Sequence, residues 1–371
     1  MKIVMLMNSS QACFYFRREL MGCLLSRGHE IHAICGDDSF GPKIKEIGVN
    51  FWHIPIVNRS VDVFGSFIFR RKLRKLLLDL RPDVFFSFQI KPIAYGNHVA
   101  KKAKIPHIFC MVEGLGDGFS RQSLKYRMAE LYLSHKLKQC FRVAESCFVM
   151  NQEDIDFFVE QKIMEKKKAI LINGTGIDPC EYPYVKMTNF NSVVMISRLI
   201  KSKGVLDFCE AAALCKKQRP DLEFSLIGHE SDITKEDLLR FINSGAINYL
   251  GAVPDLHRSL KEMTVFVLPT YYNEGFPRSI LEAMATGRPV ITTNTKGCNV
   301  EVEEGVNGVF VPPKNPQELA TAILRLCNNK EKLIKFGLNG RERAEKLFNA
   351  TNISNYIVNI VEGKTNREDY P

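Results

Sequence analysis

The chain has 371 residues, of which 45% are hydrophobic and 25% charged, and its formal net charge is +10. This length exceeds one hydrophobic core of ordinary size, so two domains are expected, and no run of about 18 apolar residues predicts a membrane-spanning helix. Its eleven cysteines are odd in number and lack a C-x-x-C spacing, which argues against a disulfide framework or a zinc cluster and favours a reducing, cytoplasmic location.

The positive charge is concentrated in the first half of the chain. Residues 1–185 hold 27 Lys and Arg against 19 Asp and Glu, whereas residues 186–371 hold 24 against 22. Nucleic acid, an anionic membrane surface and a phosphorylated substrate are each candidates for what this half faces.

Apolar runs alternate with helical patterns along the chain, which predicts βα units and parallel sheets. The opening MKIVMLM is interpreted as a buried strand, because it lacks the long apolar centre and small-residue cleavage site of a signal peptide. A first helix is expected at residues 16–30, after the loop NSSQACFY. The strands of the first sheet are expected at residues 2–8, 30–36, 83–88, 107–112, 146–151 and 169–176.

The second half repeats this alternation and ends in helices only. Its strands are expected at residues 192–198, 223–228, 247–251, 265–270, 289–294 and 308–313. Three helical patterns follow Asn315, and the last is expected to cover the second sheet or to cross back to the first domain.

The domain boundary is expected near residues 178–191, which are rich in Pro, Asn and aromatic residues and have no period. The predicted parts are an N-terminal domain at 1–182, a second domain at 190–345, and a C-terminal helix and tail at 346–371. The fold class is therefore α/β, with two Rossmann-like domains whose parallel sheets face each other across a cleft. Function is expected in the loops that follow the strands.

The strongest motif is LPTYYNEGFPRSILEAMATGRPVI at residues 268–291. Pro277 is expected as the first residue of a helix, where its missing N–H costs nothing, and Gly287 as the left-handed cap that ends it. The free N–H groups near Ser279 would then bring the positive end of the helix toward a phosphate. A carboxylate one turn further, Glu282, is placed to accept hydrogen bonds from ribose hydroxyls, and Glu274 on the loop faces what lies beyond the phosphates.

Glu274 and Glu282 form E-x7-E with GFP directly after the first glutamate. This segment resembles the retaining glycosyltransferases of the GT-B fold, family 4. The resemblance implies that Glu274 lies near the transferred sugar and Glu282 on the ribose of the donor. It also implies donor contacts from the residues around them, namely Gly275, Phe276, Pro277, Ser279 and Ile280.

A second segment agrees with this interpretation. Arg198 and Lys203 stand between a strand and a helix in SVVMISRLIKSKG, and Gly204 allows close approach of the backbone. Two fixed cations and a helix N-terminus can stabilise a departing nucleoside diphosphate without a metal. In the family that the sequence resembles, the matching Arg and Lys contact the diphosphate.

Two further loops are expected on the donor side. IGHESD places Gly228 after a strand, and LGAVPD places Val253 where the resemblance implies a nucleobase, usually uracil, held by backbone contacts. The expected donor is therefore a UDP-sugar, with no other cofactor. The one D-x-D pattern, Asp154 and Asp156, falls in a first helical turn, where the helix dipole already favours acidic residues, so no metal site is expected.

The acceptor is expected on the first domain. Residues 59–82 mix Phe64, Phe67, Phe69, Leu73 and Leu76 with Arg70, Arg71, Lys72, Arg74 and Lys75. They suit either an interfacial helix on anionic lipid or an ordinary amphipathic helix with a solvated basic face. The segment SLKYRMAELYLSHKLKQCFR adds a second basic, aromatic face.

Residues 89–119 resemble a subgroup of the same family that extends polyprenyl-diphosphate-linked glycans in bacteria, the N-acetylgalactosaminyltransferases in particular. The resemblance implies that Lys91 meets acceptor phosphate and that Glu113 orients or deprotonates the attacking hydroxyl. Gly114 and Gly116 would let the loop approach the sugar, and Arg17 on the first helix is a further acceptor candidate.

The predicted activity is retaining transfer of a hexosyl or N-acetylhexosaminyl unit, GalNAc as the first choice, to a polyprenyl-diphosphate-linked saccharide in surface-glycan or glycoprotein assembly. The predicted location is the cytoplasmic face of the membrane, with peripheral association through the basic first domain and no nucleic acid partner. Two alternatives stay open: a non-hydrolysing UDP-sugar epimerase of the same fold, and a basic nucleic-acid-binding protein.

Overall fold

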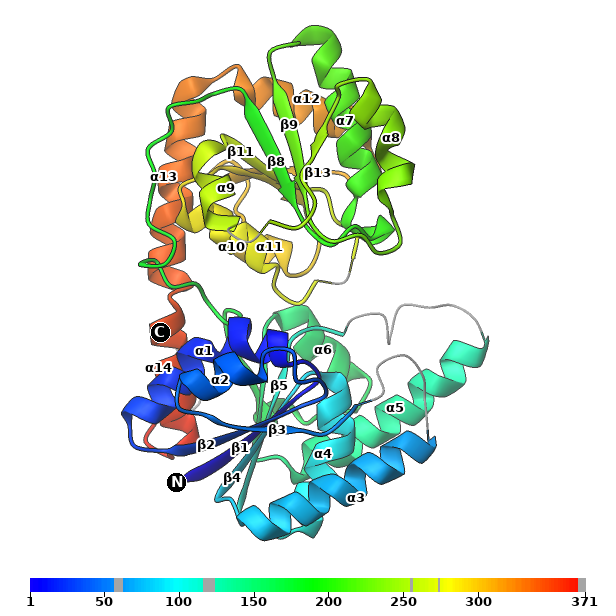
Figure 1. Cartoon of the computed structure of the whole chain (residues 1–371), viewed down its shortest axis with the longest axis vertical. Coiled ribbons are helices and arrows are strands. Elements are labelled where there is room, and N and C mark those ends of the chain that lie inside the picture. The colour runs from blue at the N-terminus through cyan, green and yellow to red at the C-terminus, as the bar shows by residue number, and fades with distance from the viewer. Residues whose placement is uncertain (57–62, 116–123, 254–255, 273, 366–371) are drawn as a thin grey trace. The chain divides into compact units, whose positions relative to one another are not determined.

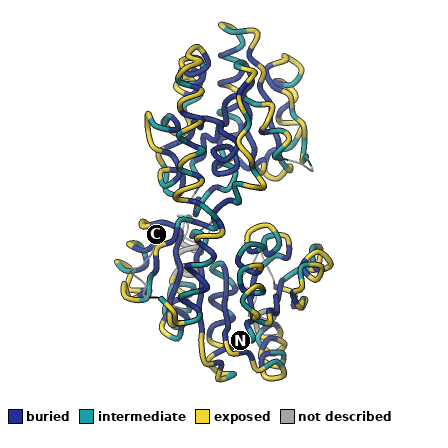
Figure 2. The backbone as a smooth tube through the Cα atoms, turned by 90° about the vertical axis from the view of Figure 1, so that its left-hand side faces the viewer, coloured by how far each residue is buried: buried dark blue, intermediate teal, exposed yellow. Residues whose placement is uncertain are grey.

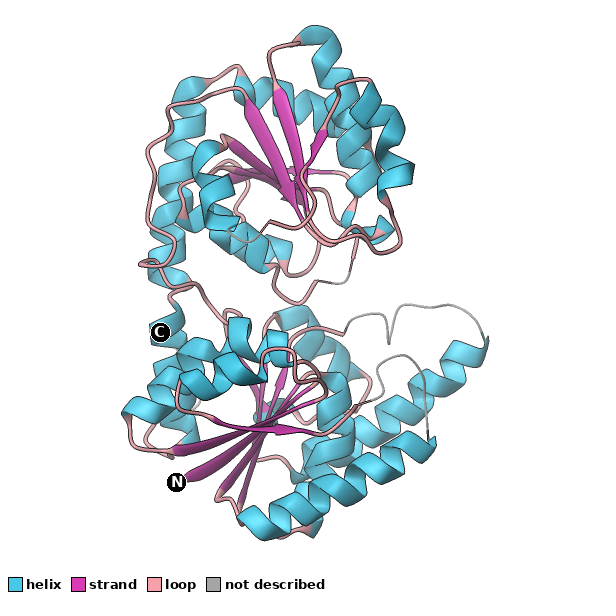
Figure 3. Cartoon of the chain, in the orientation of Figure 1, coloured by secondary structure: helices cyan, strands magenta, loops and turns pink. Residues whose placement is uncertain are grey.

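The structure, a computed structural model, describes residues 1–56, 63–115, 124–253, 256–272 and 274–365, and omits the side chains of residues 63–66 and 124–130. It divides into two compact units (Figure 1). Unit 1 contains Met1–Thr175 and Ala350–Pro371, and unit 2 contains Gly176–Asn349. Each unit is a parallel sheet with helices on both faces (Figure 3).

Unit 1 is built on a seven-stranded parallel sheet with the order β3-β2-β1-β4-β5-β6-β7. Val, Ile and Phe fill these strands because both faces of the sheet are covered, and Figure 2 shows buried backbone through the middle of the unit. The strands are β1 (Lys2–Met7), β2 (Glu30–Cys35), β3 (Asn50–His53), β4 (Val84–Phe88), β5 (His107–Val112), β6 (Ser146–Val149) and β7 (Ala169–Leu171).

The sequence prediction missed strand β3. This edge strand has four residues, NFWH, none of them buried, so it lacks the apolar run by which the other strands were found. It pairs with β2 on one side only, with His32 opposite Asn50.

The helices of unit 1 connect and cover these strands. They are α1 (Ser10–Ser26), α2 (Gly41–Glu46), α3 (Val63–Leu80), α4 (Ile90–Lys102), α5 (Leu124–Val143), α6 (Gln152–Glu160) and α14 (Ala350–Val361). Helix α1 was expected to begin at residue 16, and this was wrong. It begins at Ser10, because only Asn8 and Ser9 separate it from β1 and the carboxylate of Asp37 accepts a hydrogen bond from the Ser10 amide (3.1 Å).

The last helix, α14, packs beside α1 in unit 1 (Figure 1). Arg27 donates hydrogen bonds to Asn355, Asn359 and Glu362, each at 2.7 Å. His29 Nε2 lies 2.8 Å from a carboxylate oxygen of Glu362. Unit 1 is therefore built from both the N-terminal part of the chain and its last helix.

Unit 2 has a six-stranded parallel sheet with the order β10-β9-β8-β11-β12-β13. Its strands are β8 (Ser192–Ile196), β9 (Glu223–Ile227), β10 (Asn248–Tyr249), β11 (Val265–Leu268), β12 (Val290–Thr293) and β13 (Gly308–Val311), one for each strand expected from the sequence. Its helices are α7 (Val205–Gln218), α8 (Lys235–Asn243), α9 (Leu256–Glu262), α10 (Arg278–Ala285), α11 (Cys298–Glu301), α12 (Pro316–Cys327) and α13 (Lys330–Leu347).

The observed boundaries differ from the expected 1–182, 190–345 and 346–371. Unit 2 begins at Gly176, because the segment taken for a linker packs on it. The Ile177 amide donates to the Phe348 carbonyl (2.8 Å), and Arg341 donates to the carbonyl of Tyr182 (2.6 Å). The segment that is rich in proline and aromatic residues and has no period therefore packs on unit 2 and is not a free linker.

All eleven cysteines are free thiols, and nine of them are buried. Most of them therefore serve as small side chains of the two cores.

Candidate active site

In unit 2 the strand order reverses between β8 and β11. The crevice at such a switch point, beyond the carboxyl ends of the strands, is where open α/β sheets bind ligands. The loop after β8 carries Arg198 and the short helix η3 (Lys201–Lys203), and the loop after β11 carries Glu274. The structure therefore brings three of the predicted residues to one edge of the sheet.

Lys203 and Glu274 form a nearly buried ion pair at this point. The Lys203 ammonium donates to Glu274 Oε1, and the two side chains are only 13% and 8% exposed. Thr270 donates to the same oxygen (3.1 Å), and the Lys203 ammonium lies 5.5 Å from the centre of the Tyr272 ring. Taking this pair out of water is costly, so its presence at the switch point indicates a site and not a stabilising device.

Two glycines hold the loops of this site close together. Gly204 has φ +76°, and a Cβ there would lie 2.2 Å from the carbonyl oxygen of Pro269 after β11. Gly228 has φ +151°, and a Cβ there would lie 1.7 Å from the Ser197 carbonyl oxygen after β8. Only glycine fits either position, so the close backbone approach that the sequence analysis inferred at Gly204 is present, and Gly228 makes a second one.

The two remaining donor-side loops join the same edge. The Gly228 amide donates to the Gly251 carbonyl (2.9 Å), which ties the loop of Gly228 to the loop of Val253. Arg198 is exposed, and its guanidinium has no partner among the residues that the structure describes. Val253 is half-buried, whereas Pro254 and Asp255 of the expected LGAVPD loop lie outside the described residues.

Helix α10 follows the Glu274 loop and starts one residue later than expected. Pro277 is its N-cap and not its first residue, and Gly287, with φ +79°, follows its end. The Ile280 amide donates to the Pro277 carbonyl (2.9 Å), and the ring of Phe276 packs on Phe348. Ser279 is the second residue of α10, in the first turn, where backbone amides have no i to i−4 partner within the helix itself.

Glu282 is buried in the interior of α10. Its Oε1 accepts from the Tyr182 hydroxyl (3.1 Å) and from Arg278 Nε (3.2 Å). Burial raises the pKa of this carboxyl, and the Arg278 charge and these hydrogen bonds oppose the rise. Tyr182 comes from the segment that was expected to be a linker, so sequence reasoning could not connect it to Glu282.

Glu301 is a charged residue that the sequence analysis missed. It is the last residue of α11, it is completely buried, and neither of its carboxylate oxygens has a hydrogen-bond partner among the described residues. Burial raises its pKa far above the ordinary value, and the negative charges of Glu274 and Glu282 raise it further. Nothing in its sequence context, NVEVEEG, separates it from the exposed Glu303 and Glu304.

Unit 1 gathers polar side chains at its own switch point, between β1 and β4. Arg17 donates to Glu113 Oε1 and lies over the ring of Phe88, 4.8 Å from its centre. Gln89 donates to Glu113 Oε2 (3.1 Å) and accepts from the Asn8 amide (3.3 Å). Gln89 also has φ +71°, an unfavourable value for a residue with a side chain, and strain of this kind is common at functional sites.

This network changes the roles expected for Arg17 and Glu113. Arg17 was expected to contact the acceptor, but it is 2% exposed and occupied by Glu113 and the Phe16 carbonyl. Both oxygens of Glu113 are engaged, so it is held in place as an ion-paired carboxylate. Sequence reasoning missed Gln89, whose signal is its position directly after β4.

The other acceptor candidates lie close to this network in the chain. Lys91 is half-buried near the start of α4, and burial lowers its pKa. Gly114 has φ +138°, as suits a loop that turns directly after β5. Gly116 lies outside the described residues.

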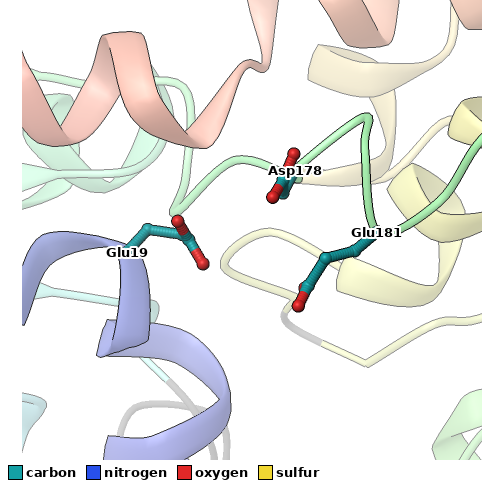
Figure 4. A group of neighbouring side chains, drawn as sticks. All are labelled: Glu19, Asp178 and Glu181. Carbon is teal, nitrogen blue, oxygen red and sulfur yellow. The ribbon is translucent and has the colours of Figure 1, made fainter. Parts of the chain in front are cut away.

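Acidic residues in the described part of the chain take part in local hydrogen bonds. Asp154 is buried and exchanges hydrogen bonds with Asn151, accepting from its side chain (3.0 Å) and donating its amide (2.8 Å), so Asn151 caps α6 and Asp154 supports the cap from the first turn. Figure 4 shows Asp178 and Glu181 on the first segment of unit 2. Asp178 accepts from the Cys180 amide (2.8 Å) and closes a local turn.

Basic helices of unit 1 carry exposed apolar side chains. Phe69, Leu73 and Leu77 of α3 are buried, whereas Phe67 is 62% and Ile68 is 52% exposed. Phe64 lies outside the described side chains. On α5, Leu131 and Tyr132 are exposed. Among the described residues, no helix combines the length and the apolar character needed to span a bilayer.

Two family models match the chain. Residues 15–161, in unit 1, match a glycosyl transferase 4-like domain, and residues 191–329, in unit 2, match the domain of glycosyl transferases group 1. These matches favour transfer over the epimerase and nucleic-acid-binding alternatives.

Two relatives act on lipid-linked saccharides by name. The N,N'-diacetylbacillosaminyl-diphospho-undecaprenol alpha-1,3-N-acetylgalactosaminyltransferase of Campylobacter jejuni is 28% identical over 358 residues, which cover 93% of this chain and 94% of that protein. The UDP-Gal:alpha-D-GlcNAc-diphosphoundecaprenol alpha-1,3-galactosyltransferase of Escherichia coli is 24% identical over 324 residues, 81% of each chain.

Solved structures share the two-unit architecture. Anabaena HepE, crystallised with UDP, superposes with a TM-score of 0.80 at 19% identity and covers 98% of this chain and 100% of its own. The sucrose-phosphate synthase of Thermosynechococcus elongatus gives 0.79 at 17% identity, with coverage of 98% and 99%. With two parallel-sheet units, a glycosyl transferase 4-like domain in the first and a group 1 domain in the second, the chain belongs to the glycosyltransferases of the GT-B fold.

Proposed function

We propose that the enzyme transfers a hexosyl or N-acetylhexosaminyl unit, GalNAc as the first choice, from a UDP-sugar to a polyprenyl-diphosphate-linked saccharide with retention at the anomeric carbon. The observation that carries this proposal is the buried Lys203–Glu274 pair at the switch point of unit 2, beside α10. The names of the Campylobacter and Escherichia relatives support the choice of acceptor and, for the former, of sugar.

The donor would be held by charge and backbone amides. Lys203 and Arg198 would neutralise the diphosphate as the bond between the anomeric carbon and the phosphate oxygen breaks, with the Ser279 amide at the start of α10 as a further donor. Because cations and amides meet this need, we propose that no metal is required. Glu282 would hold the ribose, with the Tyr182 hydroxyl and Arg278 fixing its orientation.

Glu274 would orient the sugar while the ion pair with Lys203 holds its carboxylate in place. The acceptor oxygen forms the new bond to the anomeric carbon, its proton passes to the departing phosphate oxygen, and UDP leaves. Glu113, fixed by Arg17 and Gln89, would orient the acceptor hydroxyl, and Lys91 would meet acceptor phosphate.

The exposed Phe67 and Ile68 of α3 and the neighbouring basic residues support peripheral association with an anionic membrane surface. We place the enzyme at the cytoplasmic face of the membrane on this basis. The lipid carrier of the proposed acceptor would be reached there.

The test is incubation of the enzyme with polyprenyl-diphosphate saccharides and a panel of UDP-sugars, followed by mass analysis of the lipid product. Free UDP should appear only when an acceptor is present, whereas an epimerase would convert the UDP-sugar without one.

A matched pair of variants then checks the site. Lys203→Ala should lower kcat by about 100-fold or more, as expected for loss of a charge that stabilises a leaving group. Lys201→Ala removes an exposed lysine from the same short helix and should change kcat less than about twofold. Equal activity of the two variants would contradict the proposed role of Lys203.

A further inference from the structure

Unit 1 contains a basic pocket that the proposed reaction does not use. The cavity has a volume of about 530 Å³ and is formed by the end of α5, the end of α6 and the short helix η2 (Lys166–Lys168). A cavity of this size falls in the usual range for small-molecule sites. Its charged lining consists of one carboxylate, Glu165, and six cations: Lys138, Arg142, Lys162, Lys166, Lys167 and Lys168.

Local structure accounts for only two of these cations. Lys168 donates to the carbonyls of Phe141 (3.1 Å) and Ala144 (2.7 Å) and so caps the end of α5. Lys167 pairs with Glu165 (2.9 Å). The cationic side chains of the other four, Lys138, Arg142, Lys162 and Lys166, form no hydrogen bond or ion pair with any residue that the structure describes.

The pocket is separate from the candidate active site of unit 1. Its residues precede β6 and β7, so they lie at the amino-terminal edge of the parallel sheet. Asn8, Gln89 and Glu113 follow β1, β4 and β5 and lie at the opposite, carboxyl-terminal edge. A ligand in the pocket would therefore not occupy the acceptor position.

We propose that this pocket binds a phosphate-bearing anion, either a phospholipid head group or a soluble oligophosphate. Four unpaired cations in one concave site repel each other and raise the local potential, and an anion relieves that repulsion. Phosphate suits such a site because several ammonium and guanidinium groups can contact its oxygens at once. The wall includes the buried Phe141 and Met164, so the site is rigid on its apolar side.

The backbone at Lys162 allows a clean test. Lys162 has φ +54°, a left-handed conformation that glycine adopts without strain, so Lys162→Gly removes the charge at no cost to the fold. Lys104 has φ +59°, is exposed and lies outside the pocket. The pocket variant is Lys162→Gly with Lys166→Gln, and the control is Lys104→Gly with Lys101→Gln, which removes the same charge from the same unit.

Both variants and the unmodified chain are titrated with inorganic tripolyphosphate by calorimetry, with UDP present throughout. They are also sedimented with phosphatidylcholine vesicles that contain either phosphatidylglycerol or no anionic lipid. The pocket variant should bind roughly twentyfold more weakly than the control, since each lysine near an anionic surface contributes about fivefold.

If only the pocket variant loses affinity for tripolyphosphate, the ligand is a soluble anion. If the pocket variant loses affinity only for phosphatidylglycerol vesicles, the ligand is a lipid head group. Equal binding by the pocket variant and the control in both assays would overturn the proposal. This outcome would leave the proposed transfer reaction untouched, because that reaction is tested at Lys203 in unit 2.

Discussion

At the scale of single residues, the donor side of unit 2 is unusual in its concentration of buried acid. Glu274, Glu282 and Glu301 are all buried, and the electrostatic influence of the first two reaches Glu301. Lys203 pairs with Glu274 and Arg278 pairs with Glu282, but Glu301 forms no ion pair or hydrogen bond with the described residues, and the charge of Lys203 only partly offsets the rise of its pKa. A buried carboxyl in this position is stable only when it is protonated.

We therefore expect Glu301→Gln to stabilise the enzyme at alkaline pH. The folded-state pKa of Glu301 is raised, so its effect on stability is favourable below the unfolded pKa of about 4.3 and becomes unfavourable as the pH rises toward the folded value. Glutamine does not titrate, so the variant should gain about 1–3 kcal/mol at pH 8 and little at pH 5. The free energy of urea unfolding as a function of pH measures this.

Glu303→Gln serves as the control, because Glu303 is exposed and only two residues away. A pH profile of Glu301→Gln that matches the profile of Glu303→Gln would show that Glu301 is ionised in the folded state.

The sequence predicted the residues of the candidate site that lie in one continuous motif. Glu274 and Glu282 share one strand, loop and helix, and Lys203 lies on η3 in the loop that follows β8. The sequence analysis missed Tyr182 and Gln89, because their roles depend on contacts with residues that lie 100 and 24 positions away in the chain, respectively. Arg17 was found as a candidate but given the wrong environment, since burial of a charged side chain cannot be inferred from helical position alone.

At the scale of the elements, the approach of η3 to the end of β11 depends on Gly204. We expect Gly204→Ala to weaken UDP binding at least tenfold and to destabilise unit 2 by several kcal/mol, because the new Cβ would strike the Pro269 backbone and displace the loop of Lys203. Calorimetric titration with UDP and thermal unfolding measure the two effects.

Gly245→Ala is a control that separates the effect of a left-handed backbone conformation from the effect of a steric clash. Gly245 has φ +71°, but a Cβ there would meet nothing within 4 Å, so this variant should lose only about 1 kcal/mol and keep its affinity for UDP. Equal losses in the two variants would mean that the close approach at Gly204 is unimportant.

The docking of α14 on α1 depends on Glu362. Burial alone would raise the pKa of Glu362, but hydrogen bonds from Lys364, His29 and Arg27 outweigh it and lower the pKa to about 2. The stabilisation is therefore present above the unfolded pKa of about 4.3 and is lost as the pH falls toward 2. At pH 7, Glu362→Gln should lower the free energy of opening of α14 by about 2 kcal/mol, measured by hydrogen exchange of its amides.

Glu342→Gln breaks an exposed pair with Lys346 on α13 and should leave the protection of the α14 amides unchanged. Unchanged protection of α14 in Glu362→Gln would refute the anchoring role.

Elements with a buried run of apolar residues were the predictable ones. Strands β8 to β13 and the three helices after Asn315 follow the expected order, since burial imposes their periodicity. This burial is within unit 2 for the strands and for α12 and α13, and within unit 1 for α14. The edge strand β3 and the early start of α1 were not predictable, because they are set by pairing with β2 and by the side chain of Asp37.

At the scale of the whole molecule, the two units differ both in net charge and in how the chain passes through them. Unit 1 holds 29 Lys and Arg against 20 Asp and Glu, and unit 2 holds 22 against 21. The positive field therefore belongs almost entirely to the unit with the basic helices and the basic pocket. The chain leaves unit 1 after Thr175 and returns to it at Ala350, so unit 2 alone is one continuous segment.

This continuity predicts that residues 176–349 fold by themselves and bind UDP. A second fragment, residues 190–345, follows the boundaries expected from the sequence and lacks the buried Ile177, Met187 and Phe348. Each buried side chain of this size is worth about 1.5–3 kcal/mol, so the shorter fragment should be several kcal/mol less stable. It also lacks Tyr182, so Glu282 loses a hydrogen-bond donor and UDP affinity should fall further. Thermal unfolding and UDP titration of both fragments measure these differences; identical melting temperatures and affinities would place the true boundary of the unit near residue 190, and would remove Tyr182 from the donor site.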